Sequence, residues 1–143
     1  MIDTLQSVTS RNQLQFAEFF AGIGLVRKGL EQEGSWQCAF ANDIDRIKGE
    51  IYAKNFGNDH LCIDDIAKLH ASNIPDVTLV TASFPCQDLS QAGLRRGLAG
   101  DRSGSFFELI RILNELATER RLPQAVLIEN VVGETALQEG FPP

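Results

Sequence analysis

Short apolar runs alternate with helix-length amphipathic segments along most of this chain. Five runs have the apolar and β-branched character of buried strands: residues 14–19, 36–41, 61–63, 77–82 and 125–129. Between them, apolar positions recur at helical spacing from residue 25 to Gly34, from about residue 45 to Gly57, and from about residue 103 to Pro123, with a weaker helical turn near residues 66–69. This alternation predicts an α/β fold, Rossmann-like, with a mostly parallel sheet and helices on both faces.

The apolar stripes also predict which side of each helix is buried. The three predicted stripes are Leu25, Val26 and Leu30; Ile47, Ile51 and Tyr52; and Phe106, Leu109, Ile110, Leu113 and Leu116. Ser103 or Ser105 is expected to cap the third helix, and Arg120 and Arg121 suit its C-terminal end.

Residues with chemical potential follow the predicted strands. They are the glycine turn at residues 20–24, Asp43, Asp64 with Asp65, Cys86, and Glu129 with Asn130, one group after each strand in turn. Because the carboxyl ends of parallel strands share one edge of a sheet, where such folds bind ligands, we expect these groups to form one site.

The composition indicates a single domain without a metal or membrane role. The 143 residues are divided into a loose lead-in at 1–13 and one domain at 14–143. The three cysteines have no CxxC spacing and the chain has only two histidines, so we expect reduced thiols and no metal site. Neither a signal peptide nor an apolar run of about 18 residues is visible, so a cytoplasmic protein is expected.

The net charge of −6 argues against a free-standing nucleic-acid binder, which usually has a basic face. Arg95, Arg96 and Arg102 nevertheless form a local basic strip in the glycine-rich segment 87–104, which reads as a long functional loop.

Each candidate group has a functional and a structural interpretation. The turn Phe20-Ala21-Gly22-Ile23-Gly24 would let a ligand approach the backbone at a helix N-terminus, but Arg27 stands where a dinucleotide motif has its third glycine. Asp43 is placed to bind ribose hydroxyls, or else Asp43 or Asp45 caps the next helix. Asp65 precedes a helical turn, and its simpler interpretation is as the cap of that turn.

Cys86 leaves a buried strand for a polar loop and is a candidate nucleophile, since a small thiolate fraction is reactive at neutral pH. Neither His60 nor His70 is placed as its base, which argues against a cysteine protease. Glu129 ends an apolar run, so we expect it to be partly desolvated and proton-donating; alternatively it caps a turn.

Six strings resemble, in order, the motifs of cytosine-5 DNA methyltransferases: EFFAGIGL at 18–25, NDID at 42–45, DDI at 64–66, SFPCQ at 83–87, DRSGSFF at 101–107 and ENV at 129–131. The likeness covers about residues 14–133, with Glu18 where many members have Asp.

The resemblance implies S-adenosyl-L-methionine as cofactor and double-stranded DNA as substrate. The cofactor would be bound by Phe20, Ala21, Gly22, Ile23, Gly24, Asp43 (ribose), Ile44, Asp65 with Ile66 (adenine) and Pro85. Cys86 would attack carbon 6 of a flipped cytosine, Glu129 would bind the ring at N3 and the exocyclic amine, and Asn130 would hold the two segments in register. Gln87, Ser90, Arg95 and Arg96 would lie near DNA.

The resemblance also implies parts that have no counterpart after the ENV string: an arginine motif, a target-recognition region and a closing segment. We therefore expect a partial catalytic domain, truncated after the fifth strand and incomplete alone, from a bacterial restriction–modification or related system, acting at the nucleoid. The alternatives are an inactive cofactor-binding fragment and one subunit of a split methyltransferase whose partner chain carries target recognition. A tRNA methyltransferase and a nicotinamide-dependent oxidoreductase fit the motifs less well.

Overall fold

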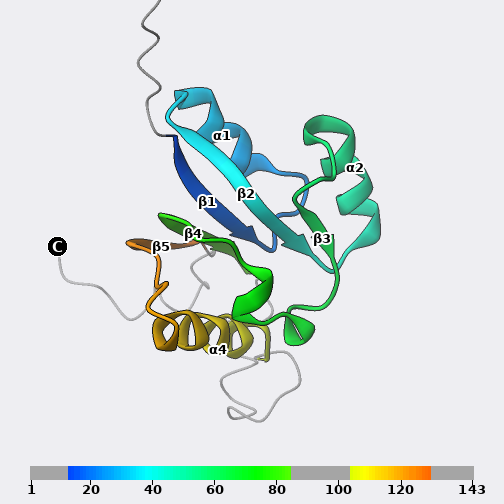
Figure 1. Cartoon of the computed structure of the whole chain (residues 1–143). Helices are drawn as coiled ribbons and strands as arrows, with labels where there is room; N and C mark the ends of the chain where they lie inside the picture. Colours follow the sequence, from blue (N-terminus) through cyan, green and yellow to red (C-terminus); the bar gives the residue numbers. More distant parts are fainter. Residues whose placement is uncertain (1–12, 85–103, 130–143) are drawn as a thin grey trace, which may run out of the picture.

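The computed structural model describes residues 13–84 and 104–129, and these residues form a parallel sheet. Its strands are β1 (Leu14–Phe19), β2 (Trp36–Asp43), β3 (Leu61–Ile63), β4 (Leu79–Ser83) and β5 (Ala125–Glu129). The spatial order is β3-β2-β1-β4-β5, and every neighbouring pair is parallel (Figure 1). The five strands predicted from the apolar runs are confirmed, with small shifts at the ends of β2 and β4.

The strand order reverses direction at β1. The chain moves outward from β1 to β3 and then returns to β4 on the other side. Because each crossover is right-handed, connections running in opposite directions cover opposite faces. Helices α1 (Leu25–Glu33) and α2 (Arg46–Phe56) therefore lie over one face, and α4 (Gly104–Thr118) lies over the other with the 3₁₀ turns Ile66–Lys68 and Ala71–Asn73 (Figure 1).

Two apolar clusters sit on the two faces of the sheet. The larger one joins Phe19, Val80 and Ala82 of the sheet to Leu109, Ile112 and Leu116 of α4. The smaller one joins Phe16, Cys38 and Leu79 of the sheet to Tyr52 of α2. Four residues of the predicted stripe of α4 are thus confirmed, namely Phe106, Leu109, Leu113 and Leu116, whereas Ile110 is not in the cluster and Ile112 is an added core residue.

The predicted inward faces of α1 and α2 are only partly confirmed. In α1, Leu30 packs against the smaller cluster, but Leu25 is 71% exposed and the buried residue is Arg27. In α2, Tyr52 is buried as predicted, but Ile47 is exposed and Gly49 is buried. A Cβ at Gly49 would lie 2.5 Å from Ile63 Cδ1, so α2 approaches β3 closely on its glycine side. Close packing at a glycine has overridden the apolar periodicity.

The ends of α1 and α2 follow the sequence prediction, whereas Ser105 lies inside α4, and Arg120 and Arg121 lie beyond its end. Asp45 caps α2 by accepting hydrogen bonds from the Ile47 and Lys48 amides, and Gly57 ends that helix. Gly34, with a φ of 90°, ends α1. Within residues 13–84 and 104–129, no helix is long and apolar enough to cross a membrane.

Candidate functional site

Among the described residues, the carboxyl ends of the five strands lie along one edge of the sheet, as predicted. Phe19 is aligned with Asn42 of β2 and with Ala82 of β4, so the ends of β1, β2 and β4 lie side by side. Asn42 is aligned with Cys62 near the end of β3, and Ser83 with Glu129 at the end of β5. The edge therefore brings together the glycine turn, Asp43 and the start of the segment after β4, at the point where the strand order reverses.

The turn after β1 has an unusual backbone. Phe20, Gly22 and Gly24 all have positive φ values, of 56°, 57° and 86°. A positive φ at a bulky residue such as Phe20 is strained, and strain of this kind clusters at ligand sites. A Cβ added at Gly22 would meet nothing within 4 Å, so the backbone is open to a ligand on that side. The turn leads directly into α1, so the N-terminal end of that helix lies beside it.

Asp43 braces this turn from the neighbouring strand. Its Oδ2 accepts a hydrogen bond of 2.7 Å from the Gly22 amide, and its Oδ1 accepts one of 2.8 Å from the Asp45 amide. The side chain that caps α2 is Asp45, so the alternative of Asp43 as the helix cap is excluded. A carboxylate has about four acceptor positions, so two remain at Asp43 for a ligand with hydroxyl groups.

The third strand is tied to the same edge by Asn42, a contact that sequence reasoning did not identify. The side-chain Nδ2 of Asn42 donates to the backbone carbonyl oxygens of Cys62 and Asp64, at 3.1 and 2.9 Å. Asp65 then caps the following 3₁₀ turn through the Ala67 amide, as its simpler interpretation predicted. Ile66 is buried in the core, so its side chain is not part of an open surface.

Apolar side chains border the acidic edge. Ile44, directly after Asp43, is 67% exposed, and Ile23 in the glycine turn is also exposed. The Phe20 ring packs on the ring of Phe84, the residue directly after β4, with 4.6 Å between the ring centroids. The edge thus offers both carboxylates and apolar surface to a ligand.

Glu129 lies at this edge but in a different environment from the one expected. All of β5 is exposed, including Glu129, so the predicted partial desolvation of its carboxylate is wrong. The remaining predicted site residues, Pro85, Cys86, Gln87, Ser90, Arg95, Arg96 and Asn130, lie outside the described residues.

Glu18 is a further candidate that motif comparison alone passed over as a mild change. It is 2% exposed on β1, and its Cα partner on β4 is Thr81. Within the described part of the chain, neither Glu18 Oε2 nor Thr81 Oγ1 has a hydrogen-bond partner. Burial raises the pKa of Glu18 to about 7, although a hydrogen bond from the Arg27 backbone and the Arg27 charge oppose the shift. Neighbouring strands therefore present two unsatisfied polar groups on one face, close to the turn.

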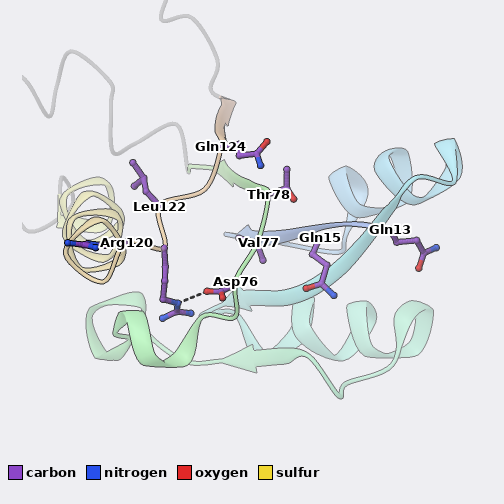
Figure 2. A pocket seen from close by; sticks show the side chains of 9 residues that line it. Gln13, Gln15, Asp76, Val77, Thr78, Arg120, Leu122 and Gln124 are labelled. Carbon is purple, nitrogen blue, oxygen red and sulfur yellow. Dashed lines mark hydrogen bonds and ion pairs between the residues drawn. The ribbon is translucent and has the colours of Figure 1, made fainter. Parts of the chain in front are cut away.

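A polar pocket of about 330 Å³ lies at the opposite end of the sheet (Figure 2). Its lining includes Gln15 at the start of β1, Thr78 before β4 and Gln124 before β5, and Arg121 pairs there with Asp76 at 2.5 Å. Ligands of parallel sheets bind at the carboxyl ends of the strands. This pocket opens at the amino ends, so it is not the candidate site.

Comparison with known proteins points to one family. The family model described as "C-5 cytosine-specific DNA methylase" matches residues 14–139. The chain is 41% identical over 123 residues to Type II methyltransferase M.DsaV of Dactylococcopsis salina, covering 86% of this chain and 33% of that protein. It is 36% identical over 118 residues to Type II methyltransferase M.HhaI of Haemophilus parahaemolyticus, covering 82% and 34%.

A solved structure agrees with these sequence matches. The S. pombe Dnmt2 methyltransferase superposes with a TM-score of 0.68 at 32% identity, covering 87% of this chain and 38% of that one. The chain spans about a third of the length of the curated relatives it matches.

Proposed function

The chain belongs to the C-5 cytosine-specific DNA methylase family, and from that premise we propose that it carries the cofactor site and the nucleophile of an enzyme that methylates cytosine in DNA. The observation that carries the proposal is the strained glycine turn, open at Gly22 and braced by Asp43 at the carboxyl edge of the sheet. The methyl donor is S-adenosyl-L-methionine, and the acceptor is carbon 5 of a cytosine flipped out of the duplex.

The residues of the edge fit this cofactor chemically. S-adenosylmethionine has a sulfonium cation and an ammonium group. Two acidic residues lie at the turn: Asp43 binds the Gly22 amide, and Glu18 lies on β1 just before the turn. The free acceptor positions of Asp43 suit the ribose hydroxyls, and the exposed Ile44 offers apolar surface to the adenine ring. The first amides of α1 would bind the carboxylate end of the cofactor.

When bound, the cofactor supplies an electrophilic methyl group. The Cys86 thiolate adds to carbon 6 of cytosine, and the ring electrons move to carbon 5. Glu129 hydrogen-bonds N3 and the exocyclic amine and so stabilises the charge that builds on the ring. The methyl group that the cofactor would supply would go to carbon 5, and the electron pair of the broken carbon–sulfur bond would leave with the sulfur. Loss of the carbon 5 proton to a base expels Cys86 and restores the ring.

The exposure of Glu129 matters for this mechanism. The Glu129 side chain is open to solvent on β5. The proposal therefore requires the flipped base to cover Glu129, so that its contact with N3 forms in the DNA complex.

The test has two parts. Calorimetric titration of the chain with S-adenosylmethionine is expected to show one site, and a tritiated methyl-transfer assay on mixed-sequence duplex DNA measures catalysis. In a form that transfers methyl groups, Cys86→Ser is expected to abolish transfer while cofactor affinity stays within about twofold, because sulfur attack and cofactor binding use different residues. Full transfer by that variant would refute the nucleophile assignment, and a chain that never binds the cofactor would refute the site.

A further inference from the structure

A buried polar cluster lies beneath the glycine turn, between α1 and α2. Its centre is Arg27 of α1, which is 9% exposed. Arg27 Nη1 donates to the Tyr52 hydroxyl at 3.1 Å and also contacts His60 Nε2. Arg27 Nε lies 3.0 Å from Glu31 Oε1, close enough for an ion pair, though the N–H is not aligned for a hydrogen bond. A charge buried in this way needs all of these partners.

The same cluster supports the glycine turn directly. The Arg27 guanidinium stacks over the Phe56 ring, 4.5 Å from its centroid, and lies 5.6 Å from that of Tyr52. A Cβ at Gly24 would lie 2.4 Å from Phe56 Cε2 and 3.0 Å from Tyr52 Cδ2. Two aromatic rings therefore contact Arg27 and the last residue of the turn together. A shift of either ring would change the space beside Gly24.

The protonation state of His60 affects its contact with Arg27. A guanidinium only donates hydrogen bonds, so the His60 Nε2 that faces it has to accept, and the ring has to be neutral. Protonated His60 would present an N–H and a positive charge to Arg27. Burial and the Arg27 charge both lower the pKa of His60, while Glu31 and Asp59 oppose them.

We propose that Arg27, held by Tyr52 and neutral His60, is a positioning residue that fixes the glycine turn for its ligand, and that protonation of His60 releases this hold. The proposal deepens the cofactor site and rests on the proposed function for the identity of the ligand. Arg27 occupies the position of the third glycine in dinucleotide-binding motifs. The proposal is that this arginine supports the glycine turn instead.

The direction of the pH effect follows from the sign of the shift. A histidine whose pKa is lowered by docking favours the docked turn above its ordinary value near 6.5 and loses that contribution as the pH falls through the lowered value. Glu18 works the other way, because its raised pKa favours the folded form as pH falls below about 7. Cys38 and Tyr52 have raised pKa values, that of Cys38 being about 11, so neither titrates in this range.

The experiment measures the effect of the cluster on the turn separately from ligand binding. Protection factors for amide hydrogen exchange in the turn are measured on the ligand-free chain between pH 5.5 and 8, and S-adenosylmethionine affinity is measured by calorimetry over the same range. The variants are Tyr52→Phe, which keeps the ring but removes the hydroxyl, and His60→Gln, which keeps an acceptor near Nε2 but does not titrate. The matched control is His70→Gln, since His70 is an exposed histidine beside Glu115, directly before a 3₁₀ segment on the other face of the sheet.

The wild type and His70→Gln are expected to lose protection of the turn, and about threefold to tenfold in affinity, as the pH falls, whereas His60→Gln should keep both. Tyr52→Phe should weaken binding at every pH by about tenfold, the effect of one charge-assisted hydrogen bond. A His60→Gln profile that matches the wild type would overturn the proposal, as would unchanged turn protection in Tyr52→Phe. If no form binds the cofactor, the proposed function fails, but turn protection in the ligand-free chain still tests the role of Arg27.

Discussion

The substitution Gly24→Ala tests how closely the turn is packed on α2. Gly24 is the last residue before α1, is buried, and has a φ of 86°. The added methyl group would meet Phe56 at 2.4 Å and Tyr52 at 3.0 Å. Contacts below 3.0 Å do not persist in folded proteins, so either the Phe56 ring or the turn has to move.

The expected magnitude combines two effects. A left-handed backbone at a residue with a Cβ costs about 1–2 kcal/mol, and forcing a methyl group into a packed site costs about 1–3 kcal/mol. Gly24→Ala should therefore lower the free energy of unfolding by about 2–5 kcal/mol. Phe56 has little freedom to relieve the clash, because Arg27 stacks on it and the Tyr52 ring lies 5.1 Å away, centroid to centroid.

Two neighbouring glycines provide matched controls in urea unfolding. Gly22→Ala meets no atom within 4 Å but keeps a φ of 57°, so it should show only the backbone effect of about 1–2 kcal/mol. Gly29→Ala lies inside α1 with open space around it and should stabilise the chain by about 0.5–1 kcal/mol through helix propensity. If Gly24→Ala destabilises no more than Gly22→Ala, the packing argument is refuted.

Three further predictions concern the acidic residues near the edge. Asp43→Ala removes the acceptor of the Gly22 amide and should raise the Kd for S-adenosylmethionine at least about tenfold. Calorimetry measures this Kd, and an unchanged value would contradict the role of Asp43 in cofactor binding. Asp45→Ala should lower the free energy of unfolding by about 1 kcal/mol in urea, whereas Asp45→Asn should retain most of the cap; equal losses would argue against capping. In wild type, Glu18 should make stability fall as the pH rises from about 4.5 to about 7, because its raised pKa penalises the charged form. Unfolding midpoints of Glu18→Gln should lack that slope, and an identical slope would show that another group titrates.

The sheet and the residues at its carboxyl edge were predictable because both depend on local patterns. Each strand is a short apolar run, and parallel connection alone places Asp43 and the glycine turn at one edge. The inward faces of α1 and α2 were only partly predictable from periodicity. Arg27 looks like a surface residue in the sequence, and its partners Tyr52 and His60 are 25 and 33 residues away. Similarly, the exposure of Glu129 depends on what lies against β5, which a strand's own sequence does not specify.

The glycine turn is therefore held from two directions by residues of different kinds. Asp43 binds the Gly22 amide from the neighbouring strand. The rings of Tyr52 and Phe56 pack against Gly24 from α2, and the Arg27 guanidinium stacks on the Phe56 ring. The Asp43 contact is made by a carboxylate that has acceptor positions left for a ligand, whereas the contacts of Arg27 are buried and made within the protein. Ligand binding is thus expected to strengthen the first constraint and to depend on the second. For this reason a glycine at position 27, though it would match a dinucleotide motif, would leave the turn without its support.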